Sequence, residues 1–133
     1  MAERSVPYEA ALQLPATPEA AAAARDFLRR ALRTQQLDGF GEVTELLTSE
    51  LVTNVIRHVR KSMTVRAIFD GSRIRVEVED PSPSLPLVMT ADVTADHGRG
   101  LLIVEQLATA WGAVPHPEGK TVWFELDAGE AHG

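Results

Sequence analysis

The chain has 133 residues, 44% of them hydrophobic and 24% charged, which is the composition of a soluble globular protein with one core. The formal net charge of −6 argues against a broad nucleic-acid-binding surface, although a single bound nucleotide needs only local donors. The absence of cysteine excludes disulfides, thiol catalysis and thiolate metal sites. Because the N-terminus has no signal-peptide pattern and no apolar run could span a bilayer, we expect a cytoplasmic protein without a membrane partner.

The first part of the chain predicts one strand and two helices. Residues 6–14 alternate weakly between apolar and polar side chains, as a strand does. Thr17 and Pro18 are typical of an N-cap and a first helical position, so we expect an alanine-rich amphipathic helix from there to about Gln36. After a break, the spacing of apolar residues predicts a second helix over residues 41–59.

The middle of the chain predicts a β-hairpin. Residues 63–69 and 73–79 both alternate with period two, and the Asp-Gly-Ser between them is typical of a tight turn. Side chains two apart share a face of a strand, so the apolar face of the second strand continues into Asp80. This apolar face therefore ends in a carboxylate, immediately before Pro81.

The last part of the chain predicts a loop, a helix and two strands. Residues 81–100 are irregular and rich in proline and polar side chains, and a loop of this length is compatible with a mobile lid or with an ordinary surface loop. Residues 101–111 predict a third helix. Residues 112–115 and 121–126 predict closing strands.

These elements together predict the fold class and the domain organisation. Hairpin strands with helices collected elsewhere favour an α/β (α+β) fold, a two-layer sandwich in which a mixed sheet is covered on one face by helices. Residues 1–127 are expected to form one domain, because no linker or repeat interrupts them. Residues 128–133 are small and polar, and we expect them to be a frayed tail.

The second predicted helix carries Glu50 and Asn54, four residues apart, on a face that is otherwise mostly apolar. At about 100° per residue, one arc of about 100° contains Phe40, Val43, Leu47, Glu50, Leu51, Asn54 and His58. We expect this arc to face the core, where a carboxylate or amide without a partner would cost a few kcal/mol. In one interpretation both groups lie at the edge of the apolar stripe and bond to backbone or water. In the other, Asn54 is an oxygen ligand of magnesium and Glu50 accepts the proton of an attacking hydroxyl or water.

Three further parts of the chain contain residues that could contact a ligand. Asp80 could simply open the turn that follows its strand, or it could accept a hydrogen bond from an exocyclic amine such as that of adenine. Gly98, Arg99 and Gly100 stand before a helix, where free backbone N–H groups can bind phosphate, although a Gly-x-Gly turn before a helix is common. Thr121 opens the last long strand, for which β-propensity alone is a sufficient reason.

The motifs, and the order in which they follow one another along the chain, resemble those of the GHKL ATPase superfamily. This superfamily includes histidine-kinase catalytic domains and gyrase. The similarity is greatest to its small stand-alone bacterial branch, the anti-sigma-factor serine kinases. It is carried by Glu50-Leu-Val-Thr-Asn54, by Val76-Glu-Val-Glu-Asp80-Pro-Ser-Pro and by Gly98-Arg-Gly-Leu-Leu-Ile-Val. The resemblance extends over about residues 6–126.

The resemblance implies a Bergerat-type fold that binds ATP with Mg²⁺. Asn54 would hold the metal against the phosphates, and Glu50 would be the general base. Asp80 would receive the adenine amine, with Thr121 nearby. In this family the phosphate acceptor is a serine of a small antagonist protein, and a dimer of the kinase holds a sigma factor. The first strand and helix would be candidates for the homodimer interface.

The predicted lid ends in residues to which the resemblance also assigns a role. Gly98, Arg99, Gly100 and Leu101 would border the phosphates.

The chain departs from the family at the stretch after Asp80. The usual Asp-x-Gly-x-Gly is here Asp-Pro-Ser-Pro-Ser, and without the two glycines the backbone approaches a nucleotide less closely. Three functions therefore stay open: a serine kinase that acts on an antagonist protein, a binding module that sequesters a partner with nucleotide as a switch, and a domain without a nucleotide site.

Overall fold

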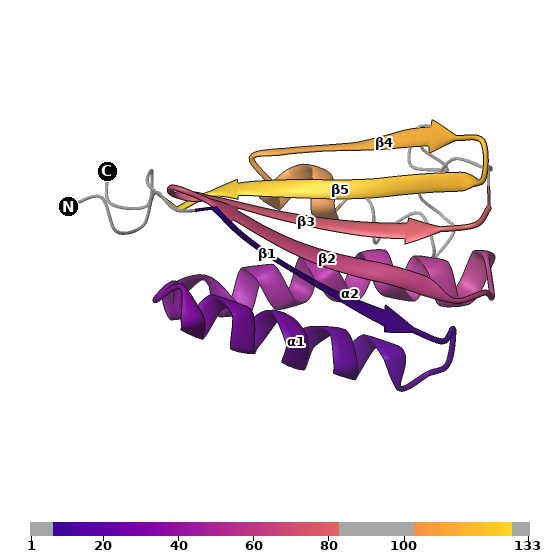
Figure 1. Cartoon of the computed structure of the whole chain (residues 1–133), viewed down its shortest axis with the longest axis horizontal. Helices are drawn as coiled ribbons and strands as arrows, with labels where there is room; N and C mark the ends of the chain where they lie inside the picture. The colour runs from indigo at the N-terminus through magenta and orange to yellow at the C-terminus, as the bar shows by residue number, and fades with distance from the viewer. Residues whose placement is uncertain (1–6, 83–102, 129–133) are drawn as a thin grey trace.

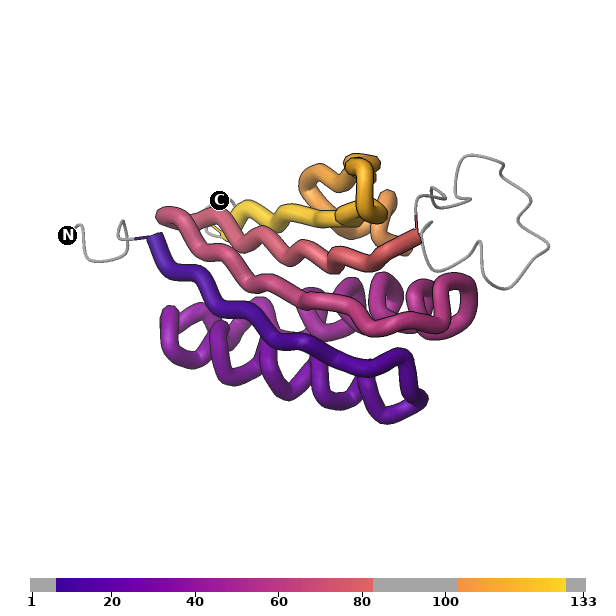
Figure 2. Tube along the Cα trace, turned by 45° about the vertical axis from the view of Figure 1, so that its right-hand side comes forward, coloured from indigo at the N-terminus to yellow at the C-terminus, as the bar shows by residue number. Residues whose placement is uncertain are grey.

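The computed structural model describes residues 7–82 and 103–128, which form a sheet layer and a helix layer (Figure 1). The five strands have the order β1-β2-β3-β5-β4, with β1 along one edge (Figure 2). They span Tyr8–Leu14 (β1), Met63–Asp70 (β2), Arg73–Asp80 (β3), Ala110–His116 (β4) and Gly119–Asp127 (β5). The predicted two-layer α/β sandwich is confirmed.

Two helices, α1 (Ala20–Thr34) and α2 (Gly41–His58), cover one face of the sheet, and the short 3-10 helix η2 (Asp38–Phe40) joins them (Figure 1). All pairings among the five strands are antiparallel, where a mixed sheet was expected. The reason is the helical hairpin: α1 runs back along β1 and α2 runs forward again, so β2 enters the sheet opposite in direction to β1.

The first helix begins later than its sequence pattern predicts. Residues 18–19 form a turn, and the N–H of Ala20 donates to the carbonyl oxygen of Thr17 at 2.9 Å. The N-cap is Glu19, which makes no side-chain capping bond, so the prediction of Thr17 as N-cap is wrong. The buried face of α1 consists of small and branched apolar residues: Ala20, Ala24, Leu28, Ala31 and Leu32.

The β2–β3 hairpin follows the period-two prediction. Both strands bury alternate residues against the helices, and Gly71 in the turn has a φ of 63°, which glycine adopts at little cost. Val76 and Val78 are buried on the helix side of β3, and Asp80 is the last buried residue on that side. The carboxylate therefore points into the space between the two layers.

The predictions for the third helix and the tail need correction. Among the described residues the helix covers 103–107, and Trp111 belongs to β4, where it pairs with Phe124. Strand pairing with β5 therefore overrides the helical spacing. Ala128 is not frayed, because it is 2% exposed and its N–H donates to the Ser72 carbonyl at 2.7 Å. No helix in the described ranges has the length and hydropathy needed to cross a bilayer.

Candidate functional site

The buried face of α2 is rotated relative to the predicted arc. It consists of Thr44, Leu47, Thr48, Leu51, Val52 and Val55. Glu50 and Asn54 are half-buried at one margin of this face, and His58 is exposed, so the expectation that these three face the core is wrong. The apolar pattern counted Thr44 and Thr48 as polar, whereas α2 packs against both α1 and the sheet and buries these two threonines as well.

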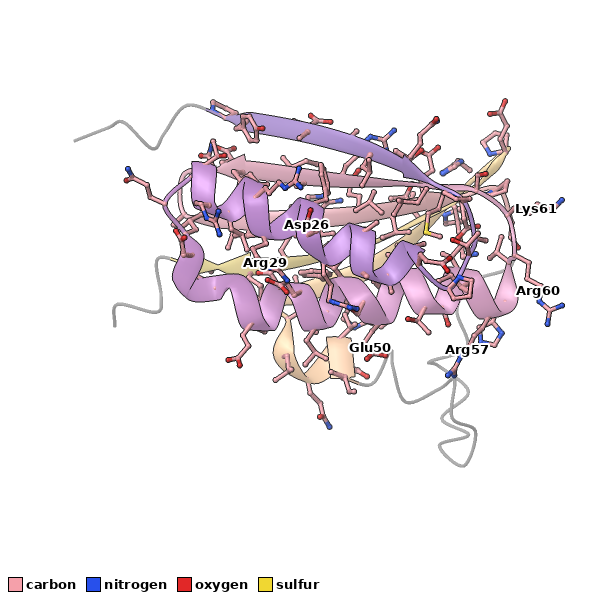
Figure 3. The ribbon with its side chains drawn as sticks, turned by 90° about the horizontal axis from the view of Figure 1, so that it is seen from below. Asp26, Arg29, Glu50, Arg57, Arg60 and Lys61 are labelled. Carbon is pink, nitrogen blue, oxygen red and sulfur yellow. The ribbon has the colours of Figure 1, made fainter. Side chains whose placement is uncertain are left out.

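Glu50 and Asn54 nevertheless keep unpaired polar groups. Neither side chain takes part in a hydrogen bond or ion pair with any described residue. Glu50 extends from the margin of α2 that is remote from α1 (Figure 3). Asn54 lies one helical turn further along the same margin. This margin of α2 therefore offers a carboxylate and an amide that remain available to a ligand.

Asp80 is fully buried at the end of β3, with a side-chain exposure of 0%. Its Oδ1 accepts a hydrogen bond from the Ser82 N–H at 2.8 Å, so Asp80 does open the turn after its strand. The same oxygen also accepts a hydrogen bond from Lys120 Nζ at 3.1 Å. One carboxylate oxygen is thus used entirely within the protein.

Lys120 is the partner of Asp80 and was not predicted from the sequence. The β3–β5 register places it directly opposite Asp80, and its side chain is only 3% exposed. Its ammonium group also donates to the carbonyl oxygen of Ser82 at 3.3 Å. The period-two pattern of β5 contained the signal, because Lys120, Val122 and Phe124 must share one face.

The second carboxylate oxygen of Asp80, Oδ2, accepts no hydrogen bond from any described residue. It lies 3.1 Å from Lys120 Nζ, close enough for an ion pair, but the arrangement lacks hydrogen-bond geometry. The ion pair offsets part of the cost of burying this oxygen, but Oδ2 still lacks a hydrogen bond. Oδ2 can therefore gain from a donor supplied by a ligand, and an exocyclic amine is such a donor.

Thr121, which was predicted to lie near the adenine, does not share a face with Asp80. Thr121 is on the opposite face of β5 from Lys120, opposite Glu79 in the register, and its Oγ1 lies 3.2 Å from His116 Nε2. Direct contact of the Thr121 side chain with a ligand at Asp80 is therefore not expected.

Several predicted residues cannot be placed, because they lie outside the described ranges: Gly98, Arg99, Gly100, Leu101 and most of the predicted lid.

Exposed cations stand at the C-terminal end of α2. Arg57, Arg60 and Lys61 are exposed at this end (Figure 3), and none of them pairs with a carboxylate of the described residues. β2 begins at Met63, and its second residue, Thr64, pairs with Glu79 of β3. The cations therefore lie at the same end of the sheet as Asp80, on a chain whose net charge is −6.

A surface hollow of about 310 Å³ lies between α1 and α2 at the other end of the helix layer. Its lining includes Glu45, which accepts two hydrogen bonds of 3.1 and 2.8 Å from Arg29 of α1. These bonds raise the pKa of Arg29, and the guanidinium keeps its charge. None of the residues predicted to bind ligand lines this hollow, and its internal ion pair leaves no unpaired buried group there.

Comparison with known proteins adds three findings. Residues 14–126 match the model of the histidine kinase-like ATPase domain. An uncharacterized protein from Streptomyces coelicolor is 34% identical over 87 residues, which cover 62% of this chain and 82% of that protein. The crystal structure of the RsbU and RsbW domains of Rv1364c from Mycobacterium tuberculosis matches 90% of this chain with a TM-score of 0.69 and 23% identity. This chain spans only 32% of that larger one, and the likeness shows the shared fold.

Proposed function

The chain belongs to the histidine kinase-like ATPase domain family, and from this premise we propose that it is an ATP-binding regulatory protein with the activity of an anti-sigma-factor serine kinase. The observation that carries the proposal is the buried Oδ2 of Asp80, which accepts no hydrogen bond from any described residue and lies at the end of the sheet near which α2 also ends. This oxygen would accept the amine of adenine. We further propose that the domain extends beyond residue 127 to include Ala128.

The margin of α2 would serve the phosphates in this proposal. Asn54 would hold a magnesium ion through its side-chain oxygen, and the ion would neutralise phosphate charge. Glu50 would take the proton of the acceptor hydroxyl, since its half-buried carboxylate pairs with no described residue. The stretch 98–101 would border the phosphates, and Thr121 would act only through the backbone of β5.

The protein partners follow from the family resemblance alone. The phosphate acceptor would be a serine of a small antagonist protein, and a sigma factor would be the protein that a dimer of this chain sequesters. We propose no nucleic-acid or membrane partner and a cytoplasmic location.

A second function, a binding module without phosphotransfer, is favoured by one specific observation. Asp80 is already paired with Lys120, and proline and serine follow it where the family has a glycine within two residues. In this alternative, Lys120 competes with the adenine amine for Asp80, and the missing glycines keep the backbone away from the nucleotide. In this case nucleotide binding would switch the affinity for a partner, and no phosphate would be transferred.

A thermal-shift titration with magnesium-ATP tests nucleotide binding. A ligand that binds only the folded state raises the apparent stability, so we expect the Tm of the wild type to rise with concentration. In Asn54→Ala the rise should be lost, while the neighbouring variant Thr53→Ala should retain it. Asn54 is a sharper target than Asp80, because Asp80→Asn would leave the buried Lys120 ammonium without its counter-charge. A wild type whose Tm does not respond would overturn the proposal.

Transfer of labelled phosphate separates the kinase from the binding module. The wild type is incubated with labelled ATP and an antagonist protein, and we expect Glu50→Gln to lose most of the transfer while Glu42→Gln, exposed in the first turn of α2, keeps it. Equal transfer by wild type and Glu50→Gln would refute Glu50 as base. ATP binding without transfer by the wild type would instead establish the module.

A further inference from the structure

Lys120 has a hydrogen-bond donor that no described acceptor uses, beside the Asp80 oxygen that accepts no hydrogen bond. A lysine ammonium has three donors. Two of them are used within the described residues, by Asp80 Oδ1 at 3.1 Å and by the Ser82 carbonyl at 3.3 Å. The third donor has no acceptor in hydrogen-bond geometry there. Asp80 Oδ2 and Lys120 Nζ form a buried ion pair at 3.1 Å without hydrogen-bond geometry, so each keeps the capacity for one further hydrogen bond to a ligand.

We propose that Asp80 and Lys120 together recognise the Watson–Crick edge of adenine, and that Lys120 is a specificity-determining residue of the site. Asp80 Oδ2 accepts from the 6-amine, and Lys120 Nζ donates to the adjacent ring nitrogen N1. The inference rests on the proposed function, to which it adds the second point of base recognition. The two side chains point the same way, because they are directly paired residues of neighbouring strands.

The site presents an acceptor (Asp80 Oδ2) next to a donor (Lys120 Nζ), and this order selects adenine over guanine. Guanine presents an oxygen where adenine has its 6-amine, and an N–H where adenine has the accepting N1. A guanine in the same orientation would place oxygen against the Asp80 carboxylate and N–H against the Lys120 ammonium. A site built to hydrogen-bond a group discriminates strongly against an analogue that leaves its buried polar groups unpaired.

Burial makes both contacts strong. The side chains are 0% and 3% exposed, so water competes little for them. Hydrogen bonds to charged groups are stronger than neutral ones, and each of the two contacts is expected to contribute about tenfold in affinity. An aspartate without the lysine would form a hydrogen bond only with the 6-amine of the base.

A series of nucleotides tests the proposal on the unmodified chain by isothermal calorimetry. 1-Deaza-ATP replaces N1 by C–H and removes only the Lys120 contact, so its Kd should rise about tenfold. Purine riboside triphosphate lacks the 6-amine and should lose a similar factor, and GTP should bind more weakly than either. Equal Kd values for ATP and 1-deaza-ATP would overturn the role of Lys120 while leaving the proposed function intact. No binding of ATP at all would overturn both.

A variant of Lys120, compared with the wild type for ATP and 1-deaza-ATP, tests the same contact from the protein side. Lys120→Met keeps the length of the side chain and removes the donor, so the ratio of the two Kd values should fall from about ten to about one. Lys61→Met, an exposed lysine in the same part of the molecule, should keep the ratio of the wild type. An unchanged ratio in Lys120→Met contradicts the proposal, as does tighter ATP binding, which would make Lys120 an internal competitor. If Lys120→Met does not fold, the nucleotide series on the wild type decides.

Discussion

Two threonines of α2, Thr44 and Thr48, are fully buried, and their hydroxyl groups make no hydrogen bond within residues 7–82 and 103–128. A hydroxyl buried without a partner opposes folding by about 1–3 kcal/mol. Thr48→Val keeps the branched shape of the side chain and removes the polar atom, so we expect the free energy of unfolding to rise by about 1 kcal/mol. Urea denaturation measures this change. Thr53→Val, half-buried on the same helix, should change it little, and a less stable Thr48→Val would contradict the argument.

Gly119, the first residue of β5, holds the backbone of β5 against Asp80. A Cβ at this position would lie 2.0 Å from the Asp80 carbonyl oxygen, and the φ of 153° is one that other residues rarely adopt. We therefore expect Gly119→Ala to lower the free energy of unfolding by about 3 kcal/mol, because the end of β3 must shift.

The control for this prediction is Gly39→Ala, since a Cβ there would meet nothing within 4 Å. Urea denaturation of both variants gives the comparison. A loss in Gly119→Ala no larger than that in Gly39→Ala would show that the close approach to Asp80 is not tight. ATP binding should also weaken in Gly119→Ala, because Asp80 and Lys120 depend on the same pairing.

At the scale of single elements, the positive end of α2 makes a prediction about binding. Arg57 and Arg60 are exposed and pair with no described carboxylate, and they lie beyond Asn54 at the end of the helix. Their charges should attract the phosphates of a nucleotide. We expect the double variant Arg57→Gln/Arg60→Gln to bind ATP about threefold to tenfold more weakly at low salt, and this difference should shrink as salt is added.

The matched control is Arg30→Gln/Arg33→Gln on α1, which removes the same charge from exposed positions on another element. Calorimetry at two ionic strengths gives both affinities. Equal weakening in the two double variants would mean that only net charge matters, and an effect that does not depend on salt would point to direct contact.

The open face of the sheet carries an ion-pair network between β3 and β5. Arg75 donates to Glu77 and Glu125, both at 2.8 Å, and its guanidinium lies 4.2 Å from the ring centroid of Trp123. Burial alone would lower the pKa of Arg75, but the hydrogen bonds with the two glutamates outweigh it and raise the pKa. The arginine therefore stays charged and ties together the two strands whose ends carry Asp80 and Lys120.

Sequence patterns within short segments correctly predicted the elements whose conformation depends on those segments alone. The alternation of β2 and β3 and the glycine turn identified the hairpin and the face of Asp80, because period two and a positive φ are properties of short segments. The helical spacing failed at Trp111, where pairing with β5 decides the conformation. Lys120 was missed because its partner is distant along the chain, and only the register brings the two together.

At the scale of the whole molecule, the fold brings the proposed site together at one end from distant segments. β3 ends there with Asp80, and β5 begins there with Gly119 and Lys120. α2 ends there too, a few residues before Met63, which starts β2. The proposed site therefore depends on the pairing of β3 with β5, since the two strands must be in register for the Asp80–Lys120 pair to form.

A backbone contact at the opposite end of the sheet predicts the last residue of the domain. Ala128 is buried, and its N–H donates to the Ser72 carbonyl at 2.7 Å, which joins the end of β5 to the β2–β3 turn. Removal of residues 129–133 should leave the free energy of unfolding unchanged, whereas removal of residues 128–133 should lower it by about 1–2 kcal/mol through the lost hydrogen bond and methyl burial. Urea denaturation of both truncations measures the difference. An equal loss in both would extend the domain beyond Ala128, and no loss in either would end it at Asp127.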